Sequence, residues 1–332
     1  MVKRPKTAKI ALIIFITIFF AANLPGCGNS AAPMTEQSFL LDTIVTVTYY
    51  READRSAVLE ALDLCREYDL VFSRTNPASE LYRLNAAGSM SVSPALREVL
   101  ALALDCCRES GGRFDVTLGG VSALYDFGGE AHRPDDAALR EALSHVGWET
   151  VRIEGDTVTL SDPETVLDLG SVAKGWIADR MKELLVSRGV EHAILSLGGN
   201  ILCLGGRPDG APYKVGIQYP ERDSSALAAT VSIRGESVVT SGVYERFFVD
   251  NGEVFAHILN PKTGLPLRNG LLAVSIVGLC SARCDALSTL CFVLGLDEGL
   301  RYIEAAEGYE AVFITDDHVL HRSSGFGALE TK

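Results

Sequence analysis

Apolar and polar residues along this chain follow first a strand-like and then a helix-like period. Within residues 43–50, apolar residues such as Val45 and Val47 alternate with threonine, which predicts a strand. Within residues 57–72 the apolar positions recur three or four apart, which predicts a helix with one buried side. A second helix is expected from Ser93-Pro94, because serine caps a helix and proline is tolerated at its first position.

The second half of the chain is dominated by expected strands. Two short β-type runs flank the turn signal Gly155-Asp156 and predict a hairpin over residues 151–160. Helices are expected at residues 171–187, with Gly189 beyond the end, and at residues 285–294. Further strands are expected around Ile194 and at residues 215–219, 229–233, 247–258, 272–277 and 311–314. The pattern predicts an α+β fold with mixed, largely antiparallel sheets and packed helices, and a single domain over residues 37–332.

The N-terminus has the organisation of an export signal. Four basic residues within the first nine precede an apolar run at residues 10–22, which is too short for a comfortable membrane span. Leu24-Pro25-Gly26-Cys27 follows at once and looks like a lipoprotein cleavage box. We therefore expect residues 1–26 to be a signal peptide, Cys27 to carry a lipid, and residues 27–36 to form a short tether. A plain signal peptide or an uncleaved anchor is the alternative, and each places the domain on the extracytoplasmic face of the cell membrane.

Net charge and cysteine content limit the possible partners and the role of the cysteines. The whole chain has a net charge of −13, and removal of a leader with four basic residues and no acid takes it to about −17. Such acidity argues against a nucleic-acid partner, which needs a basic face. Seven cysteines remain beyond Cys27, so they cannot all pair, and Cys65 and Cys106 fall on apolar helix faces typical of a core.

Asp285 and Thr289 form the strongest candidate for a metal site. They lie four residues apart, and so share one face of the expected helix. A carboxylate and a hydroxyl are hard oxygen ligands, which suit Mg²⁺ or Ca²⁺. Taken alone, the pair is equally typical of an aspartate that caps a helix and a threonine that faces outward, and that interpretation is favoured for the isolated motif.

Residues 168–175 end an apolar strand and begin a helix. The N–H groups and positive dipole end of a helix N-terminus suit phosphate, and Lys174 adds a point charge. Gly170 and Gly175 let backbone approach closely, although the spacing is not that of a Walker loop. An ordinary capped helix explains the same residues.

Three other short segments carry polar groups at turns. Asp115 and Thr117 follow Gly111-Gly112 and suit either a ligand or a turn cap, and Gly198-Gly199 suits a tight turn or a close ligand approach. His257 stands at an expected strand end, where a histidine can act as a base near neutral pH or serve a structural role.

Each motif is weak alone, but their order is specific. Along the chain they run Gly112-Arg113-Phe114-Asp115-Val116-Thr117, Asp168-Leu169-Gly170-Ser171-Val172-Ala173-Lys174-Gly175, Leu197-Gly198-Gly199-Asn200, Thr240-Ser241-Gly242-Val243-Tyr244-Glu245-Arg246, His257-Ile258-Leu259-Asn260-Pro261-Lys262-Thr263-Gly264 and Asp285-Ala286-Leu287-Ser288-Thr289. As an ordered set over residues 39–314, they resemble the ApbE family of FAD:protein FMN transferases.

The resemblance implies a fold, a reaction and a set of site residues. The fold would be an ApbE-like, T-fold-like architecture. The reaction would split the pyrophosphate of FAD, release AMP and join FMN to a serine or threonine of an exported protein, such as a flavin-carrying subunit of a membrane redox complex. Mg²⁺ would be held by Asp285, Thr289 and the backbone of Ser171, with Asp285 also essential for catalysis, and His257 would deprotonate the acceptor hydroxyl. FAD would contact Leu41, Arg113, Phe114, Asp115, Asp168, Lys174 and Leu259.

The chain also departs from the family pattern. Leu41-Asp42-Thr43 stands where Met-Gly-Thr is common, Asn260-Pro261 replaces Asp-Pro, and no aromatic residue lies near Thr75. A periplasmic FAD-binding protein, or an Mg²⁺-dependent FAD pyrophosphatase that makes free FMN and AMP, would use the same residues. A non-catalytic assembly lipoprotein predicts a damaged site, and a self-flavinylated carrier needs an acceptor stretch that the sequence lacks.

Overall fold

The computed structural model describes residues 32–219 and 226–326, so the expected signal peptide and Cys27 lie outside the described residues. One large sheet of eight strands forms its centre, in the order β1-β2-β6-β7-β10-β13-β14-β15, and every pairing between these strands is antiparallel. The strands are β1 (Met34–Leu40), β2 (Thr43–Tyr49), β6 (Ala193–Leu197), β7 (Asn200–Leu204), β10 (Ser237–Gly242), β13 (Leu271–Gly278), β14 (Tyr309–Thr315) and β15 (Leu320–Arg322).

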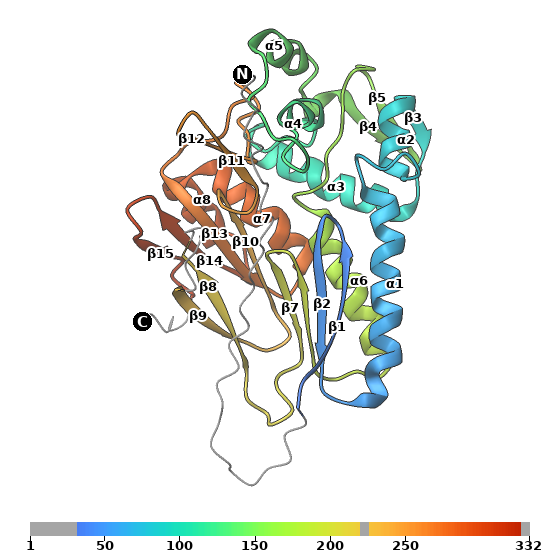
Figure 1. The fold of residues 1–332 in the computed structure, drawn as a ribbon, viewed down its shortest axis with the longest axis vertical. Coiled ribbons are helices and arrows are strands. Elements are labelled where there is room, and N and C mark those ends of the chain that lie inside the picture. The colour runs from blue at the N-terminus through green and yellow to red at the C-terminus, as the bar shows by residue number, and fades with distance from the viewer. Residues whose placement is uncertain (1–31, 220–225, 327–332) are drawn as a thin grey trace, which may run out of the picture.

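Helices and three small sheets surround this centre (Figure 1). The helices are α1 (Arg55–Phe72), α2 (Glu80–Ala87), α3 (Pro94–Glu109), α4 (Gly119–Tyr125), α5 (Asp136–Ser144), α6 (Ala173–Ser187), α7 (Ser281–Leu294) and α8 (Leu296–Glu304), with 3-10 turns η1 (Glu52–Asp54) and η2 (Trp148–Thr150). The small sheets are β3 (Ser89–Ser91) with β5 (Thr157–Leu160) and β4 (Val151–Glu154), β8 (Tyr213–Gln218) with β9 (Leu227–Ile233), and β11 (Phe247–Asp250) with β12 (Glu253–Ala256).

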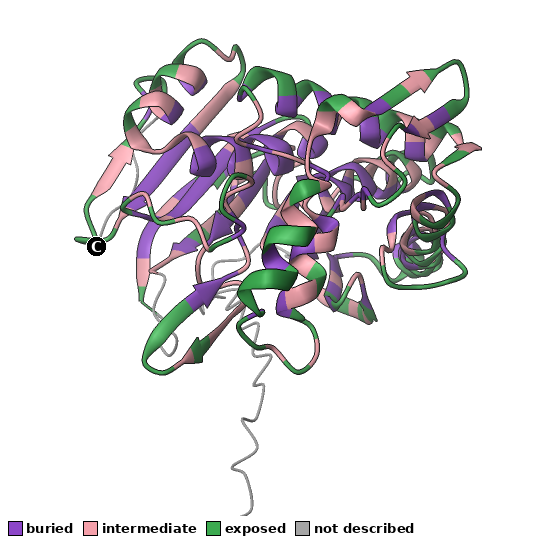
Figure 2. Cartoon of the chain, turned by 90° about the horizontal axis from the view of Figure 1, so that it is seen from above, coloured by how far each residue is buried: buried purple, intermediate pink, exposed green. Residues whose placement is uncertain are grey.

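The two faces of the large sheet are covered differently. Helices α1, α6, α7 and α8 pack on one face and enclose the main core. The β8–β9 hairpin covers part of the other face, where Ile217 and Val231 pack against sheet residues such as Val238 and Val312. Figure 2 shows the strands of the sheet buried along most of their length between these layers. This arrangement confirms the α+β fold with largely antiparallel sheets.

Helix α7 lies at the centre of the helical layer. Eleven of its fourteen residues are buried, so it presents almost no face to solvent. The neighbouring helix α6 approaches it closely at Gly175, where an added Cβ would lie 2.2 Å from the carbonyl oxygen of Ser281. Only glycine permits this approach. Because α6 packs so closely on α7, water is excluded from the polar groups of α7 at this contact.

Most expected elements are confirmed, and two are corrected. Residues 43–50 form β2, residues 57–72 lie in α1, and the hairpin at residues 151–160 is β4–β5. The single strand expected at residues 247–258 is wrong: β11 and β12 form a hairpin around Asn251-Gly252, both of which have positive φ.

The helix expected at residues 285–294 is four residues too short. Helix α7 begins at Ser281, because the Asp179 carboxylate on α6 accepts hydrogen bonds from the Ser281 and Ala282 N–H groups at 3.0 and 2.9 Å. A cap supplied from a distant helix leaves no local sequence signal. Cys65 and Cys106 are buried, as expected. Among the described helices, none combines the length and the apolar character that crossing a membrane requires.

Candidate active site

Asp285 links the two central helices. It lies in the second turn of α7, it is 3% exposed, and its Oδ2 accepts a hydrogen bond of 2.8 Å from the Gly175 N–H on α6. Its Oδ1 lies 3.9 Å from Lys174 Nζ. Burial raises the pKa of Asp285, while Lys174 and the Gly175 N–H act in the opposite direction. The N-cap of α7 is Cys280, so Asp285 is not the capping residue that the isolated motif suggested.

A chain of hydroxyl groups continues from Asp285 to Thr289. Ser288 Oγ donates to the Asp285 carbonyl oxygen at 2.8 Å and lies 2.7 Å from Ser241 Oγ on β10. Ser241 Oγ in turn lies 3.0 Å from Thr289 Oγ1. These contacts tie Thr289 to β10, whereas the Asp285 side chain is held by Gly175 on α6. Both residues lie four apart within α7, which agrees with the helix expected there, and their joint role as metal ligands stays a prediction.

These groups fit a divalent cation that prefers oxygen ligands. Within residues 32–219 and 226–326 there is no cluster of three or more histidine, cysteine, aspartate or glutamate side chains arranged for a metal. Asp285 nevertheless offers a buried carboxylate whose Oδ1 has only the distant Lys174 beside it, and Thr289 adds a hydroxyl. Mg²⁺ suits such a site, because it binds through one or two carboxylates and takes its remaining ligands from water and phosphate.

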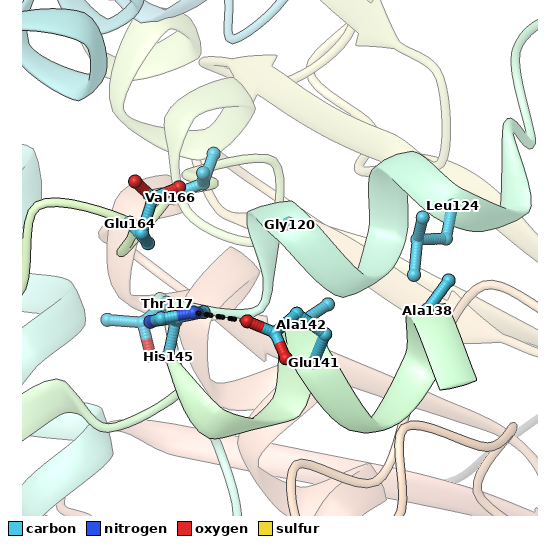
Figure 3. Close-up of a pocket in the computed structure, with 9 residues that line it drawn as sticks. All are labelled: Thr117, Gly120, Leu124, Ala138, Glu141, Ala142, His145, Glu164 and Val166. Atoms are coloured by element: carbon cyan, nitrogen blue, oxygen red, sulfur yellow. Dashed lines mark ion pairs between the residues drawn. The ribbon is translucent and has the colours of Figure 1, made fainter. Parts of the chain in front are cut away.

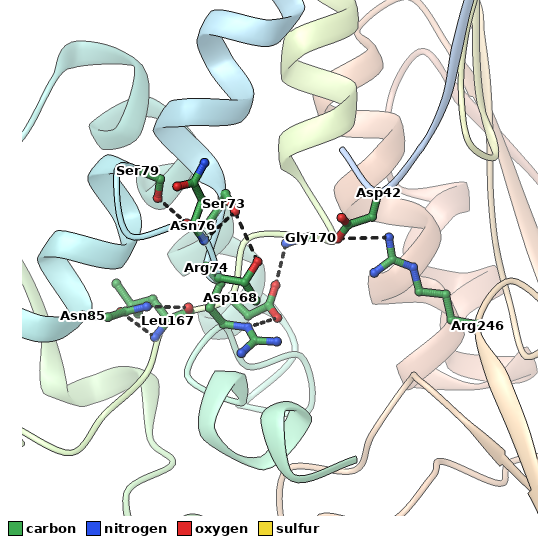
Figure 4. A network of polar contacts seen from close by, with 11 residues as sticks. Asp42, Ser73, Arg74, Asn76, Ser79, Asn85, Leu167, Asp168, Gly170 and Arg246 are labelled. Atoms are coloured by element: carbon green, nitrogen blue, oxygen red, sulfur yellow. Dashed lines mark hydrogen bonds and ion pairs between the residues drawn. The ribbon is translucent and has the colours of Figure 1, made fainter. Parts of the chain in front are cut away.

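The loop before α6 is shaped by Asp168 (Figure 4). Its Oδ1 accepts from the Gly170 N–H at 2.9 Å, and its Oδ2 accepts from Arg74 Nε at 3.0 Å. Lys174 Nζ donates to the Gly170 carbonyl oxygen at 2.9 Å. The expected phosphate loop and the expected metal residues thus meet at Lys174 and Gly175. Arg74 was not identified from the sequence, because its contact with Asp168 spans 94 residues.

His257 follows β12 and is held by one carbonyl group. The Arg246 carbonyl oxygen accepts from the His257 N–H at 3.0 Å and lies 3.2 Å from Nδ1. Since a carbonyl can only accept, Nδ1 carries the proton and Nε2 keeps a free lone pair. Desolvation, with Arg246 and Lys174 nearby, lowers the pKa of His257 to about 4. The ring is therefore neutral at pH 7.

Glu245 is a site residue to which the sequence assigned no chemistry. Burial raises its pKa to about 7; Lys174 acts against that shift and Asp285 adds to it. An added Cβ at Gly199 would lie 3.0 Å from Glu245 Oε1. The Gly198-Gly199 turn therefore makes room for this carboxylate, whereas the sequence suggested only a turn or a ligand there. The sequence did contain one indication that Glu245 belongs to the site, since it directly follows Tyr244 in a motif rich in small and polar residues.

A well-defined cavity lies away from these residues (Figure 3). Its volume is about 590 Å³, and it lies between α4 and α5, where His145 and Glu141 approach to 3.6 Å. Thr117 lines it, but Asp285, Lys174 and His257 do not. The candidate active site is therefore identified by its polar groups rather than by cavity size.

Comparison with known families matches residues 41–313 to the ApbE family. This chain belongs to the ApbE family. The match runs from the turn before β2 to Phe313 within the core strand β14.

Curated ApbE relatives and solved ApbE structures cover nearly all of the chain. A FAD:protein FMN transferase of Treponema pallidum is 33% identical over 94% of this chain and 93% of its own length. One from Klebsiella pneumoniae is 32% identical over 82% of this chain and 86% of its own. The ApbE protein of Thermotoga maritima superposes with a TM-score of 0.81 at 25% identity, and the flavin transferase ApbE of Vibrio cholerae with 0.78 at 27%; each comparison covers 89% of this chain and 98% of the other.

Three residues expected to contact FAD have other partners in this ApbE-family chain. Arg113 forms two hydrogen bonds to Glu298, at 2.7 and 2.5 Å, and Phe114 is buried in the core. Asp115 accepts from the Thr117 N–H and hydroxyl, and from the Trp148 N–H at 3.2 Å. Asp115 therefore acts as a turn cap here, and the three contacts with FAD stay predictions.

Leu41 and Leu259 lie on two other segments of the site. Leu41 has a φ of 55° in the turn between β1 and β2. Leu259 is 5% exposed and belongs to a small core with Val121, Tyr125 and Phe255. Its side chain therefore contacts protein, and its contact with FAD stays a prediction. For Ser171, which directly precedes α6, the expected backbone ligand role stays a prediction.

Proposed function

We propose that this ApbE-family protein is an Mg²⁺-dependent FAD:protein FMN transferase. It would transfer the FMN moiety of FAD to a serine or threonine hydroxyl of an exported protein and release AMP. The observation that carries the proposal is the meeting of Asp285, Lys174 and the start of α6 with His257 and Glu245 nearby. The relatives named FAD:protein FMN transferase support it over nearly the full chain.

The proposed reaction needs charge neutralisation more than covalent help. When bound, Mg²⁺ would neutralise phosphate charge at Asp285, Thr289 and the Ser171 carbonyl. The Lys174 ammonium and the positive dipole end of α6 would attract the pyrophosphate oxygens. The acidic side chains around the site make this local positive charge necessary.

His257 is suited to receive the proton of the acceptor hydroxyl. Its Nδ1–H is held by the Arg246 carbonyl, so Nε2 is the basic atom. As the hydroxyl oxygen bonds to the FMN phosphorus, its proton passes to Nε2, and the bond from that phosphorus to the bridging oxygen of AMP breaks. The low pKa keeps the ring neutral before reaction. A bound pyrophosphate would raise that pKa, because negative charge stabilises the imidazolium.

The place of action is also part of the proposal. Cleavage before Cys27 and its lipidation would anchor the enzyme on the extracytoplasmic face of the cell membrane. Acceptors would then be exported segments, such as flavin-carrying subunits of membrane redox complexes.

The test combines the protein with FAD, Mg²⁺ and an exported flavoprotein segment from the same genome. AMP release together with an FMN-sized mass gain on the acceptor is the expected result. Release of AMP and free FMN with every such segment unmodified would identify an FAD pyrophosphatase instead. Bound FAD without AMP release would leave only an FAD-binding protein. Asp285→Asn, which keeps the side-chain shape, is the negative control.

A further inference from the structure

The turn between β1 and β2 carries an unusual residue at the edge of the active site. Leu40 pairs with Thr43, so the loop is just Leu41-Asp42, and both residues have positive φ, 55° and 56°. Two-residue loops of this kind favour Asn-Gly, because left-handed backbone is strained for other side chains. Aspartate tolerates that conformation better than most residues. Asp42 therefore places a carboxylate at a turn position where glycine or asparagine would fit with less backbone strain.

Asp42 faces Arg246 across the site. Its Oδ2 lies 4.0 Å from Arg246 Nη2, and Figure 4 shows the arginine extending toward it. Asp42 comes from the edge of the large sheet, whereas Arg246 follows Glu245 and holds His257 through its carbonyl group. The pair thus joins two opposite sides of the candidate site.

The contact is weak enough to be exchanged. A separation of 4.0 Å is too long for a hydrogen bond, and the Asp42 side chain is 76% exposed, so solvent and salt screen the pair. Within the described ranges, Asp42 is the one carboxylate within 4.0 Å of the Arg246 guanidinium. The planar guanidinium binds phosphate oxygens in pairs and more strongly than it holds a distant, solvated carboxylate.

We propose that Arg246 binds a phosphate of FAD and that Asp42 is the counter-ion it gives up. The inference rests on the proposed function, since it takes FAD as the substrate. Without FAD, Asp42 holds the arginine at the mouth of the site. With FAD bound, the carboxylate loses its partner, so Asp42 competes with the phosphate for Arg246 and lowers the affinity for FAD.

The experiment measures the FAD dissociation constant by flavin fluorescence, without an acceptor, on the full-length protein and with its melting temperature recorded. Asp42→Asn removes the charge and keeps a side chain that tolerates the left-handed turn. We expect it to bind FAD about two- to fivefold more tightly, less so at high salt. Arg246→Met is expected to bind about tenfold more weakly. In the double variant, Asp42→Asn should have no further effect.

A matched control removes a carboxylate from another exposed ion pair. Glu253 lies 2.6 Å from Arg268 in the β12 region, and Glu253→Gln is expected to leave FAD affinity unchanged. The proposal would be overturned if Asp42→Asn left the FAD affinity unchanged. It would also be overturned if Asp42→Asn raised the FAD affinity equally in the wild type and in the Arg246→Met variant. Neither result would affect the conclusion that the wild type binds FAD and transfers FMN. Failure of the wild type to bind FAD at all would instead overturn the proposed function, and the inference with it.

Discussion

The Gly175 N–H on α6 donates a 2.8 Å hydrogen bond to the buried carboxylate of Asp285 on α7. This bond exists because α6 has no side chain at that position and can approach the α7 backbone. The same glycine thus permits the helix contact and orients the carboxylate that is expected to bind Mg²⁺.

Gly175→Ala is expected to disturb both fold and activity. The new Cβ would lie 2.2 Å from the Ser281 carbonyl oxygen and 2.7 Å from Asp285 Cβ, so the helices must separate. Overpacking of this kind costs about 1–3 kcal/mol of unfolding free energy, which denaturant unfolding measures. Gly120→Ala is the control, since its Cβ would meet nothing closer than 3.8 Å. Equal stability of the two variants would contradict the close packing.

Asp285→Asn is expected to abolish transfer without unfolding the protein. Without the charged carboxylate the site would lose Mg²⁺, and loss of a group that stabilises the reacting phosphates costs about a hundredfold or more in rate. Burial raises the pKa of Asp285. Without Mg²⁺, in the presence of a chelator, the free energy of unfolding of the wild type should therefore fall as pH rises through the normal carboxyl range. The Asp285→Asn variant has no such charge and should not show this fall. Mg²⁺ should raise the melting temperature of the wild type but not of the variant. A variant that Mg²⁺ still stabilises would exclude Asp285 as a ligand.

His257→Gln is expected to slow transfer about a hundred- to ten-thousandfold, as loss of a general base does. It also tests the lowered pKa. The folded pKa is about 4 against 6.5 for an ordinary histidine, so the unfolded chain takes up a proton first as pH falls from 6.5 to 4. Across that range, wild type should lose about 1–2 kcal/mol more stability than His257→Gln. Parallel stability curves would show that the ring titrates normally.

Glu245→Gln is expected to change the pH dependence of stability in the opposite direction. Because the pKa of Glu245 is raised from 4.5 to about 7, its contribution to stability is present below pH 4.5 and is lost as pH rises to about 7. Wild type should therefore lose about 1–2 kcal/mol over that range relative to the variant, a figure discounted for partial exposure. Unfolding in chelator at pH 4.5, 6 and 8 would measure it, and a constant difference would refute the raised pKa.

Local patterns were enough to predict the pieces of the site. Helical spacing placed Asp285 and Thr289 on one face, and the strand-to-helix transition placed Lys174 at the start of α6. The order of the motifs then predicted the fold, since that order reflects the whole family rather than any one contact.

Contacts between distant segments were not predictable in the same way. The cap of α7 comes from Asp179 on another helix, and Asp168 is oriented by Arg74 from the end of α1. Glu245 acquires its raised pKa only after folding desolvates it near Asp285. The hairpin at Asn251-Gly252 differs, because its turn signal was present in the sequence but was included in one long strand.

The burial of α7 divides the site into a fixed and an adjustable part. A helix without a solvent-exposed face cannot shift unless the core repacks. Substitutions around Asp285 therefore cannot change substrate affinity or rate gradually without also destabilising the fold. The opposite side consists of turns, at residues 41–42, 245–246 and 257–260, where an exposed side chain such as that of Asp42 can change at little cost to the fold. Differences in substrate affinity among relatives should therefore arise at exposed positions of these turns, while Asp285, Lys174 and His257 keep the chemistry constant.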